Sequence, residues 1–333
     1  MTIRIGINGA GRIGRAILRA SRMDPLFADL AIVAINDPAP REVLAHLIKH
    51  DSVMGAFPGD PVLLEEGLQL ADQNILLTHA REPGEINWGR VGADYVIEAS
   101  GRFTRRDAAE NHFKGGARRV VITAPAKGEV KTLVMGVNEE EYDPRHHTIV
   151  SNASCTTNCL APMARVVMER FGLERGLMTT VHAVTNDQRL LDAPHTDLRR
   201  ARAAGVSIIP TSTGAAAAIG LVIPALTGRF DGLSVRVPTP NVSLVDAVME
   251  LGRDVSVDEL NQAFREAQNR YLGYCDEPLV SVDYQGNPHS GVVDGDSTRA
   301  IGSTVKVLTW YDNEWGYANR VLDLIRHMDR AAI

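Results

Sequence analysis

Short apolar runs alternate with helix-like stretches through the first half of the chain. Runs with the composition of strands lie at residues 3–7, 30–35, 95–99, 119–123 and 132–137. Residues 15–20, which follow the first of these runs, have the composition of a helix. Strand and helix therefore alternate, which predicts an α/β domain built on a parallel sheet.

The second half opens with an apolar stripe at helical spacing. The stripe consists of Leu160, Met163, Ala164, Val167, Met168 and Phe171. Ser154 is suited to cap this helix, so that Cys155 falls in its first turn. Apolar positions between residues 321 and 328 predict another helix near the C-terminus. We expect a domain boundary just before the cysteine-bearing helix.

A glycine motif follows the first predicted strand. Gly9, Gly11 and Gly14 form the pattern Gly-x-Gly-x-x-Gly ahead of a helix, where backbone N–H groups and the helix dipole bind a pyrophosphate. Asp37 ends the second apolar run, close to the spacing of about 20 residues expected for an acid that binds the adenosine ribose. Its carboxylate would repel a 2′-phosphate, so the motif predicts NAD rather than NADP.

Composition disfavours several classes of protein. With 333 residues, of which 44% are hydrophobic and 23% charged, the chain is long enough for two globular domains. A formal net charge of −6 offers no basic surface to a nucleic acid, and no apolar run suits a membrane span or a signal peptide. Three cysteines are too few for a disulfide framework, and no zinc-binding spacing occurs. We expect a cytoplasmic protein without a metal, a nucleic-acid partner or a membrane partner.

The segment SNASCTTNCLAP, residues 151–162, places Cys155 among small polar residues at the start of the predicted helix. Unpaired N–H groups and the helix dipole favour a thiolate at that position, and the polar neighbours suit an oxyanion. We therefore interpret Cys155 as an ionised nucleophile. The alternative is a small buried apolar residue, which the polar neighbours disfavour.

This cysteine segment resembles the active-site segment of phosphorylating glyceraldehyde-3-phosphate dehydrogenases. Residues 5–14, AINDP at 34–38 and WYDNEWGY at 310–317 resemble the opening, the ribose strand and the C-terminal signature of the same family. The resemblance runs along essentially the whole chain. It implies an NAD-binding domain at 1–152 with a Rossmann-type doubly wound parallel sheet, completed by a helix at 316–333. It also implies an α+β catalytic domain at 153–315 with a mainly antiparallel sheet, and a homotetramer.

By the same resemblance, Cys155 attacks the aldehyde of glyceraldehyde 3-phosphate, and His182 is the acid and base of the reaction. Oxidation of the hemithioacetal by NAD leaves a thioester, from which inorganic phosphate releases 1,3-bisphosphoglycerate. The implied reaction belongs to glycolysis and gluconeogenesis. Two small molecules, glyceraldehyde 3-phosphate and inorganic phosphate, are the implied substrates.

The resemblance also implies the binding residues. Those expected to hold the substrate and the phosphates are Ser154, Thr156, Thr185, Asp187, Arg200, Thr213, Gly214 and Arg236. The glycine motif and the resemblance together predict cofactor contacts at Asn8, Gly9, Gly11, Arg12, Ile13, Gly14, Asp37, Arg81, Ser100, Gly101, Thr123, Asn313 and Tyr317. Asp187 is typical of bacterial members, whereas Ala10 and Ala217 stand where the family commonly has phenylalanine and lysine.

Two other functions stay open at this point. A related enzyme, erythrose-4-phosphate dehydrogenase, releases its thioester to water, and residues 278–283 and 288–295 lean toward it. Thr185, Thr213 and Gly214 lean toward the phosphorylating enzyme. The second alternative is a redox-responsive protein that binds NAD and uses Cys155 as a sensor without turnover.

Overall fold

The computed structural model describes residues 2–332, which divide into two compact units. The first unit takes in the described residues of Met1–Leu133, Glu139–Ala153 and Ala318–Ile333. The second unit consists of Val134–Asn138 and Ser154–Tyr317. The chain passes from the first unit to the second immediately before Ser154, beside the predicted boundary between residues 152 and 153.

The first unit is built on a nine-stranded sheet with the strand order β3-β4-β5-β2-β1-β6-β7-β9-β8. Its strands are β1 Ile3–Asn8, β2 Leu30–Asn36, β3 Val62–Leu63, β4 Gly67–Leu70, β5 Gln73–Thr78, β6 Tyr95–Glu98, β7 Arg119–Ile122, β8 Lys131–Thr132 and β9 Ile149–Ser151. All neighbours from β5 to β8 pair in parallel, whereas β3, β4 and β5 pair antiparallel. The predicted doubly wound α/β fold is confirmed.

The helices of this unit are α1 Arg12–Met23, α2 Arg41–Lys49, α3 Arg106–Ala109 and most of α7 Trp315–Ala331. In α1 the apolar side chains Ala16, Ile17 and Leu18 are buried, because a helix that follows a parallel strand covers the sheet with its apolar face. The two central strands are apolar and buried through most of their length. Because β1 pairs in parallel with β2 and with β6, the carboxyl ends of these three strands share one edge of the sheet.

One predicted strand is wrong in extent. Only Lys131 and Thr132 form β8, instead of residues 132–137. The backbone then turns, because the Asn138 side chain accepts a hydrogen bond from the Val134 N–H at 2.9 Å and Gly136 has a φ of 81°. An apolar run does not distinguish a strand from a buried turn of this kind.

The second unit contains a seven-stranded mixed sheet in the order β11-β12-β10-β13-β16-β15-β14. Its strands are β10 Leu173–Ala183, β11 Ile209–Ser212, β12 Phe230–Val237, β13 Ser243–Leu251, β14 Leu272–Cys275, β15 Gly291–Ile301 and β16 Thr304–Tyr311. The β10–β12 and β14–β15 pairs are parallel, and the other neighbours are antiparallel. The mainly antiparallel sheet is thus confirmed.

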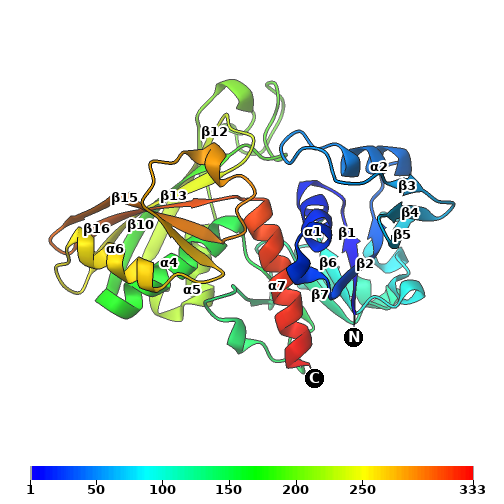
Figure 1. The fold of residues 1–333 in the computed structure, drawn as a ribbon, viewed down its shortest axis with the longest axis horizontal. Helices are drawn as coiled ribbons and strands as arrows, with labels where there is room; N and C mark the ends of the chain where they lie inside the picture. The colour runs from blue at the N-terminus through cyan, green and yellow to red at the C-terminus, as the bar shows by residue number, and fades with distance from the viewer. Residues whose placement is uncertain (1, 333) are drawn as a thin grey trace. The chain divides into compact units, whose positions relative to one another are not determined.

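Three helices, α4 Cys155–Phe171, α5 Ala215–Val222 and α6 Val257–Glu266, pack against this sheet (Figure 1). Helix α4 begins as predicted, and its apolar stripe is buried almost throughout. Within residues 2–332 no helix has the length and the apolar character needed to cross a membrane.

Candidate active site

Cys155 is the first residue of α4, and Ser154 caps this helix. The Ser154 Oγ accepts a hydrogen bond of 3.0 Å from the Thr157 N–H. Such a cap leaves the other N–H groups of the first turn without a helical partner. The Cys155 side chain is partly exposed, whereas Thr156 and Thr157 are buried. The helix therefore presents the cysteine at its positive end.

His182 lies on β10 and faces this cysteine. Its Nε2 is 3.6 Å from the Cys155 Sγ, within reach of a sulfur hydrogen bond. The Nδ1 lies 2.7 Å from the Ala183 carbonyl and 2.6 Å from an Arg236 guanidinium nitrogen. Because a ring nitrogen either donates or accepts, Nδ1 serves one of these two partners at a time. Proton transfer between the Cys155 sulfur and the His182 Nε2 therefore depends on whether Nδ1 bonds to the Ala183 carbonyl or to Arg236.

Strand pairing explains why Arg236 is there. In the parallel β10–β12 pair, His182 and Arg236 are register partners, so their side chains stand next to each other on the sheet. Arg236 also donates to the Ala183 carbonyl at 3.1 Å. Burial lowers the pKa of Arg236, while Cys155 raises it by less. A partly buried guanidinium beside the Cys155 sulfur is suited to bind an anion.

The expected ionisation of Cys155 differs from what its surroundings favour in this structure. Burial raises the pKa of the Cys155 thiol, and the opposing effects of Arg236 and of hydrogen bonds from Thr156 are smaller. Burial and the charge of Arg236 lower the pKa of His182 to about 3. The helix terminus, on which the prediction of a thiolate rested, does not by itself outweigh desolvation.

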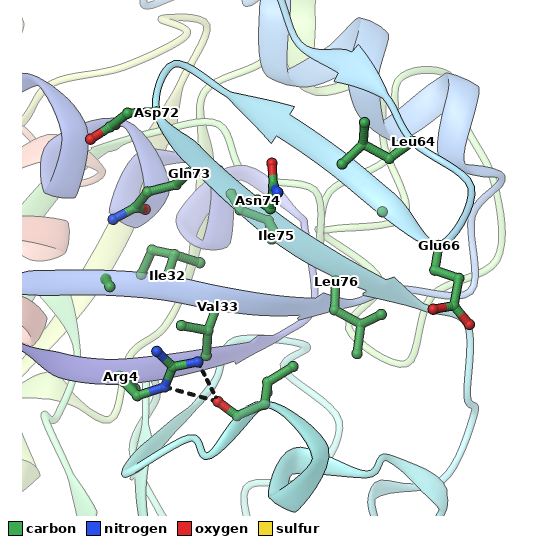
Figure 2. A pocket seen from close by; sticks show the side chains of 13 residues that line it. Arg4, Ile32, Val33, Leu64, Glu66, Asp72, Gln73, Asn74, Ile75 and Leu76 are labelled. Carbon is green, nitrogen blue, oxygen red and sulfur yellow. Dashed lines mark hydrogen bonds between the residues drawn. The ribbon is translucent and has the colours of Figure 1, made fainter.

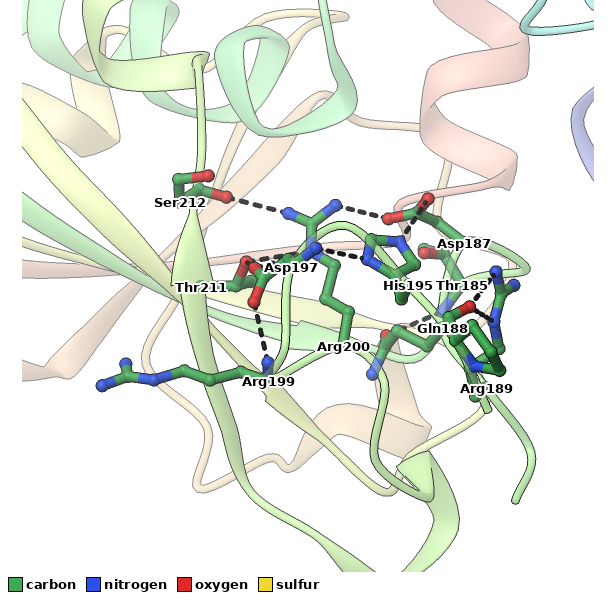
Figure 3. A network of polar contacts seen from close by, with 11 residues as sticks. Thr185, Asp187, Gln188, Arg189, His195, Asp197, Arg199, Arg200, Thr211 and Ser212 are labelled. Carbon is green, nitrogen blue, oxygen red and sulfur yellow. Dashed lines mark hydrogen bonds and ion pairs between the residues drawn. The ribbon is translucent and has the colours of Figure 1, made fainter. Parts of the chain in front are cut away.

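Asp187 and Arg200 are joined in a polar network on the loop between β10 and β11 (Figure 3). Arg200 forms an ion pair with Asp187 and donates to the Thr211 hydroxyl at 2.9 Å and to the Ser212 carbonyl at 3.1 Å. His195 contacts the same Asp187 carboxylate at 3.4 Å. Arg200 is therefore held in place by protein groups, which an incoming anion would have to share.

Three further predicted anion contacts lie on backbone turns of the second unit. The Thr185 N–H donates to the Gln188 side chain at 3.1 Å. The Thr213 hydroxyl accepts from the Ala215 N–H at 3.2 Å, and Gly214 is the N-cap residue of α5. A hydroxyl and the first N–H groups of a short helix therefore lie together at the start of α5.

The predicted contacts Asn313 and Tyr317 also belong to the second unit. The Asn313 Oδ1 accepts a hydrogen bond of 2.8 Å from the Ser243 hydroxyl, which itself accepts from the Ala183 N–H at 3.1 Å. Ser243 thereby connects Asn313 to the residue that follows His182. Tyr317 is buried, and burial together with the nearby Cys155 raises its pKa.

The glycine motif in the first unit has the geometry expected of a pyrophosphate loop. Gly9 has a φ of 99°, and a Cβ on it would lie 2.6 Å from the Ser100 backbone. A Cβ on Gly14 would lie 2.1 Å from the Gly9 carbonyl oxygen, whereas one on Gly11 would meet nothing within 4 Å. Gly9 and Gly14 are required for packing, and Gly11 leaves space above the N-terminus of α1.

Asp37 lies against this loop. Its carboxylate accepts hydrogen bonds of 2.9 Å from the Ala10 N–H and from the Ala39 N–H. The Ala10 side chain is buried, so the position that departs from the family pattern still packs. The carboxylate is thus fixed at the carboxyl end of β2, beside the glycine turn.

The other predicted cofactor contacts of this unit have different surroundings. Arg12 forms an ion pair with Asp51 at 2.9 Å, and the Thr123 hydroxyl donates to the Glu98 carbonyl at 3.1 Å. Ile13 is half-buried, whereas Arg81 and Gly101 are exposed. Asn8 and Ser100 both contact the buried Glu98 carboxylate, Asn8 at 2.6 Å through its side chain and Ser100 at 2.9 Å through its N–H.

Sequence reasoning missed Glu98 and its partner His112. The His112 Nε2 lies 2.9 Å from the Glu98 carboxylate, and its Nδ1 accepts from the Trp88 ring N–H at 3.1 Å. The signal was present in the sequence, because Glu98 is a charged residue at the end of the apolar run 95–99. A buried carboxylate at the binding edge of a sheet needs hydrogen-bond donors. Two predicted cofactor contacts, Asn8 and Ser100, supply such donors to Glu98.

A pocket of about 470 Å³ in the first unit is not this site (Figure 2). It is lined by Arg4, by residues 31–33 at the start of β2 and by residues of β5. None of the predicted cofactor contacts lines it. The glycine loop follows the opposite end of β1, where open α/β sheets bind their ligands.

No metal site competes with this interpretation within residues 2–332. In that part of the chain no group of three or more histidine, cysteine, aspartate or glutamate side chains is arranged to hold a metal ion. Cys155, Cys159 and Cys275 are free thiols.

Comparison with known proteins gives consistent matches to both halves. The family model of the glyceraldehyde 3-phosphate dehydrogenase NAD binding domain matches residues 3–106, and that of the C-terminal domain matches residues 154–313. Glyceraldehyde-3-phosphate dehydrogenase 2 of Bacillus subtilis is 52% identical over 333 residues, covering 98% of this chain and 97% of the relative. The Geobacillus stearothermophilus relative, named glyceraldehyde-3-phosphate dehydrogenase, is 51% identical with 98% of each chain covered. The one from Streptomyces coelicolor is 51% identical over 330 residues, covering 97% and 98%.

Proposed function

The chain belongs to the glyceraldehyde-3-phosphate dehydrogenase family, and we propose that it performs the family's reaction with Cys155 as the nucleophile and His182 as the acid and base. It is an NAD-dependent oxidoreductase that converts glyceraldehyde 3-phosphate and inorganic phosphate to 1,3-bisphosphoglycerate. The observation that carries the residue assignment is the 3.6 Å contact between the Cys155 Sγ and the His182 Nε2.

The reaction begins when the Cys155 sulfur bonds to the aldehyde carbon and forms a hemithioacetal. His182 takes the thiol proton through Nε2, because the two atoms are in contact, and passes it to the aldehyde oxygen, which becomes the hemithioacetal hydroxyl. Bound NAD supplies the hydride acceptor. His182 removes the hemithioacetal hydroxyl proton as the carbon is oxidised, which leaves a thioester on Cys155. Inorganic phosphate then attacks the thioester carbon, the acyl phosphate leaves, and the sulfur recovers its proton from His182.

Two sets of groups are suited to hold the anions. Arg236 and Thr185 would bind the substrate's own phosphate, since Arg236 lies beside His182 and the nucleophile. Ser154, Thr213, Gly214 and Arg200 would bind inorganic phosphate, and Asp187 would act through its ion pair with Arg200. Thr156 is buried, and its hydroxyl contacts the Tyr311 hydroxyl. Cationic and N–H donors are the groups that recognise phosphate.

The first unit fits a dinucleotide. Its glycine turn leaves space at Gly11 and packs tightly at Gly9 and Gly14, as a loop that approaches a pyrophosphate requires. The fixed Asp37 carboxylate suits a ribose with a free 2′-hydroxyl, which favours NAD. Asn313 would contact the nicotinamide amide.

We also propose that the protein is a homotetramer in the cytoplasm. Leu190, Leu191, Leu198, Val206 and Ile208, all from the segment between β10 and β11, are 70–85% exposed. So many large apolar side chains on one segment indicate a surface that is covered by another protein chain. A reaction that needs a free thiol is suited to a reducing compartment.

Kinetics of variants test the assignment. Cys155→Ser is expected to abolish NADH formation from glyceraldehyde 3-phosphate, and His182→Asn to lower kcat by about 10²- to 10⁴-fold. Cys275→Ser, which changes a thiol elsewhere in the second unit, is the matched control and should keep full activity. Full activity of Cys155→Ser would refute the assignment. Oxidation of erythrose 4-phosphate without phosphate, in preference to glyceraldehyde 3-phosphate with it, would favour the alternative enzyme.

A further inference from the structure

A single phenol connects the helix that carries the nucleophile to the strand that carries the histidine. The Tyr311 hydroxyl is 2.8 Å from the Thr156 Oγ1 on α4 and 2.9 Å from the Thr180 Oγ1 on β10. Thr156 follows Cys155 directly, and Thr180 is two residues before His182. Tyr311 also places its ring edge-on to the His182 ring, with 6.1 Å between centroids.

Tyr311 makes this connection from a strand that is not adjacent to β10. Tyr311 ends β16, which is separated from β10 by β13 in the strand order. Adjacent strands are about 4.8 Å apart, so the phenol reaches across one complete strand to meet Thr180. A long side chain ending in a hydroxyl is required for this reach, and phenylalanine would keep the packing without the hydrogen bonds.

The three hydroxyls are isolated from water. Thr156, Thr180 and Tyr311 are 3%, 1% and 2% exposed. Burial raises the pKa of Tyr311 well above its usual value, and Cys155 adds to this effect. The phenol therefore stays neutral and carries one proton, which it donates to one threonine while it accepts from the other.

The direction of the chain of hydrogen bonds follows from its end at the nucleophile. Thr156 is next to Cys155 in the first turn of α4, and a hydrogen bond from its side chain partly offsets the rise that burial causes in the pKa of Cys155. If Thr156 donates its only hydroxyl proton to the sulfur, it must accept from Tyr311, and Tyr311 must accept from Thr180. The donors then run from Thr180 through Tyr311 and Thr156 to the sulfur, and each bond polarises the next.

We propose that Tyr311 is a positioning residue that acts on Cys155 through Thr156: it orients the Thr156 hydroxyl as a donor to the sulfur and fixes the nucleophile's helix against the histidine's strand. This inference rests on the proposed role of Cys155. A hydrogen bond donated by Thr156 favours the thiolate form of Cys155, because such a bond is stronger to a charged sulfur than to a thiol.

Other groups act on the same sulfur. Those that face it or affect its ionisation are His182 from β10, Arg236 from β12, Cys159 from α4 and Tyr317 from α7. Tyr311→Phe substitutes none of these four residues and keeps the aromatic ring beside His182. A shift in Cys155 ionisation in this variant would therefore report on the hydroxyl chain.

The test compares Tyr311→Phe and Thr156→Val by the pH dependence of Cys155 alkylation with iodoacetamide in the full-length protein. Each variant is expected to raise the midpoint by about one pH unit, the size of one hydrogen bond to a charged group. Each is also expected to lower kcat about tenfold with KM values for both substrates nearly unchanged. The double variant should shift the midpoint no further than Thr156→Val alone, because Tyr311 acts through Thr156.

Tyr142→Phe is the matched control, since it removes a buried phenol hydroxyl that accepts from Arg119 at 2.9 Å in the first unit. It should lower stability without moving the alkylation midpoint. An unchanged midpoint in Tyr311→Phe, or a double variant whose shift is the sum of the two, would overturn the inference. Activity of Cys155→Ser reports separately on the proposed function, so the two failures are distinguishable.

Discussion

His182 illustrates how a single residue is governed by its surroundings rather than by its type. An ordinary histidine titrates near pH 6.5, but burial and Arg236 lower the pKa of His182 to about 3. The ring is thus neutral across the neutral range in the free protein. A neutral imidazole is the form that can take a proton from the thiol or from the hemithioacetal.

The shifted pKa predicts a pH dependence of stability. Between about pH 6.5 and 3 the unfolded chain binds a proton at His182 that the folded protein does not bind. The contribution of His182 to the free energy of unfolding is therefore full above pH 6.5 and is lost as the pH falls. When the pH falls from about 7.5 to 5, the free energy of unfolding of the wild type should decrease by about 2 kcal/mol more than that of the His182→Asn variant. Urea unfolding at both pH values, at equal protein concentration, measures this difference. Parallel losses in the two proteins would contradict it.

At the scale of elements, the packing of α1 against the glycine turn fixes the binding edge of the first unit. The helix approaches the turn so closely that a Cβ on Gly14 would lie only 2.1 Å from the Gly9 carbonyl oxygen. This position therefore excludes any side chain, whereas Gly11 faces open space.

These two glycines form a matched pair for a prediction. Gly14→Ala should destabilise the protein by about 1–3 kcal/mol, because α1 must move away from the turn. Gly11→Ala should leave stability within about 0.5 kcal/mol, since its φ of −67° suits alanine. Denaturant unfolding without cofactor separates these effects from binding. Equal stability of the two variants would show that α1 is not held by this contact.

At the scale of the whole molecule, the exposed apolar segment between β10 and β11 is the feature that bears on assembly. Its side chains Leu190, Leu198 and Val206 are 84%, 81% and 85% exposed in the single chain. The same segment carries Asp187 and Arg200, so the proposed assembly and the anion site involve one loop.

Assembly is tested by placing a charge on this segment. Val206→Glu should dissociate the proposed tetramer into smaller species, because a carboxylate is costly to bury in an apolar interface. Val62→Glu, at a 52% exposed position of β3, is the control and should remain tetrameric. Sedimentation velocity measures the species present. A wild type that sediments as a single 36.2 kDa chain would refute the tetramer.

Much of the fold and of the candidate site was predictable, because it depends on patterns of residues that are close together in the sequence. Alternation of apolar runs with helical stretches predicted the parallel sheet, and strand β2 matches the apolar run at 30–35 almost to the residue. The glycine spacing predicted the turn after β1, and Ser154 predicted the start of α4. These features depend on neighbours within a few residues, which the sequence states directly.

Other features depend on residues far apart in the chain, and only the tertiary structure decided them. The run at 132–137 has the composition of a strand, yet Asn138 turns it out of the sheet. The ionisation of Cys155 was inferred from the helix terminus, but burial acts in the opposite direction. The sequence alone supplied the side chains that we propose for the chemistry. The register of β10 with β12 and the reach of Tyr311 across β13 determined their partners, because long-range pairing sets distances that no local pattern contains.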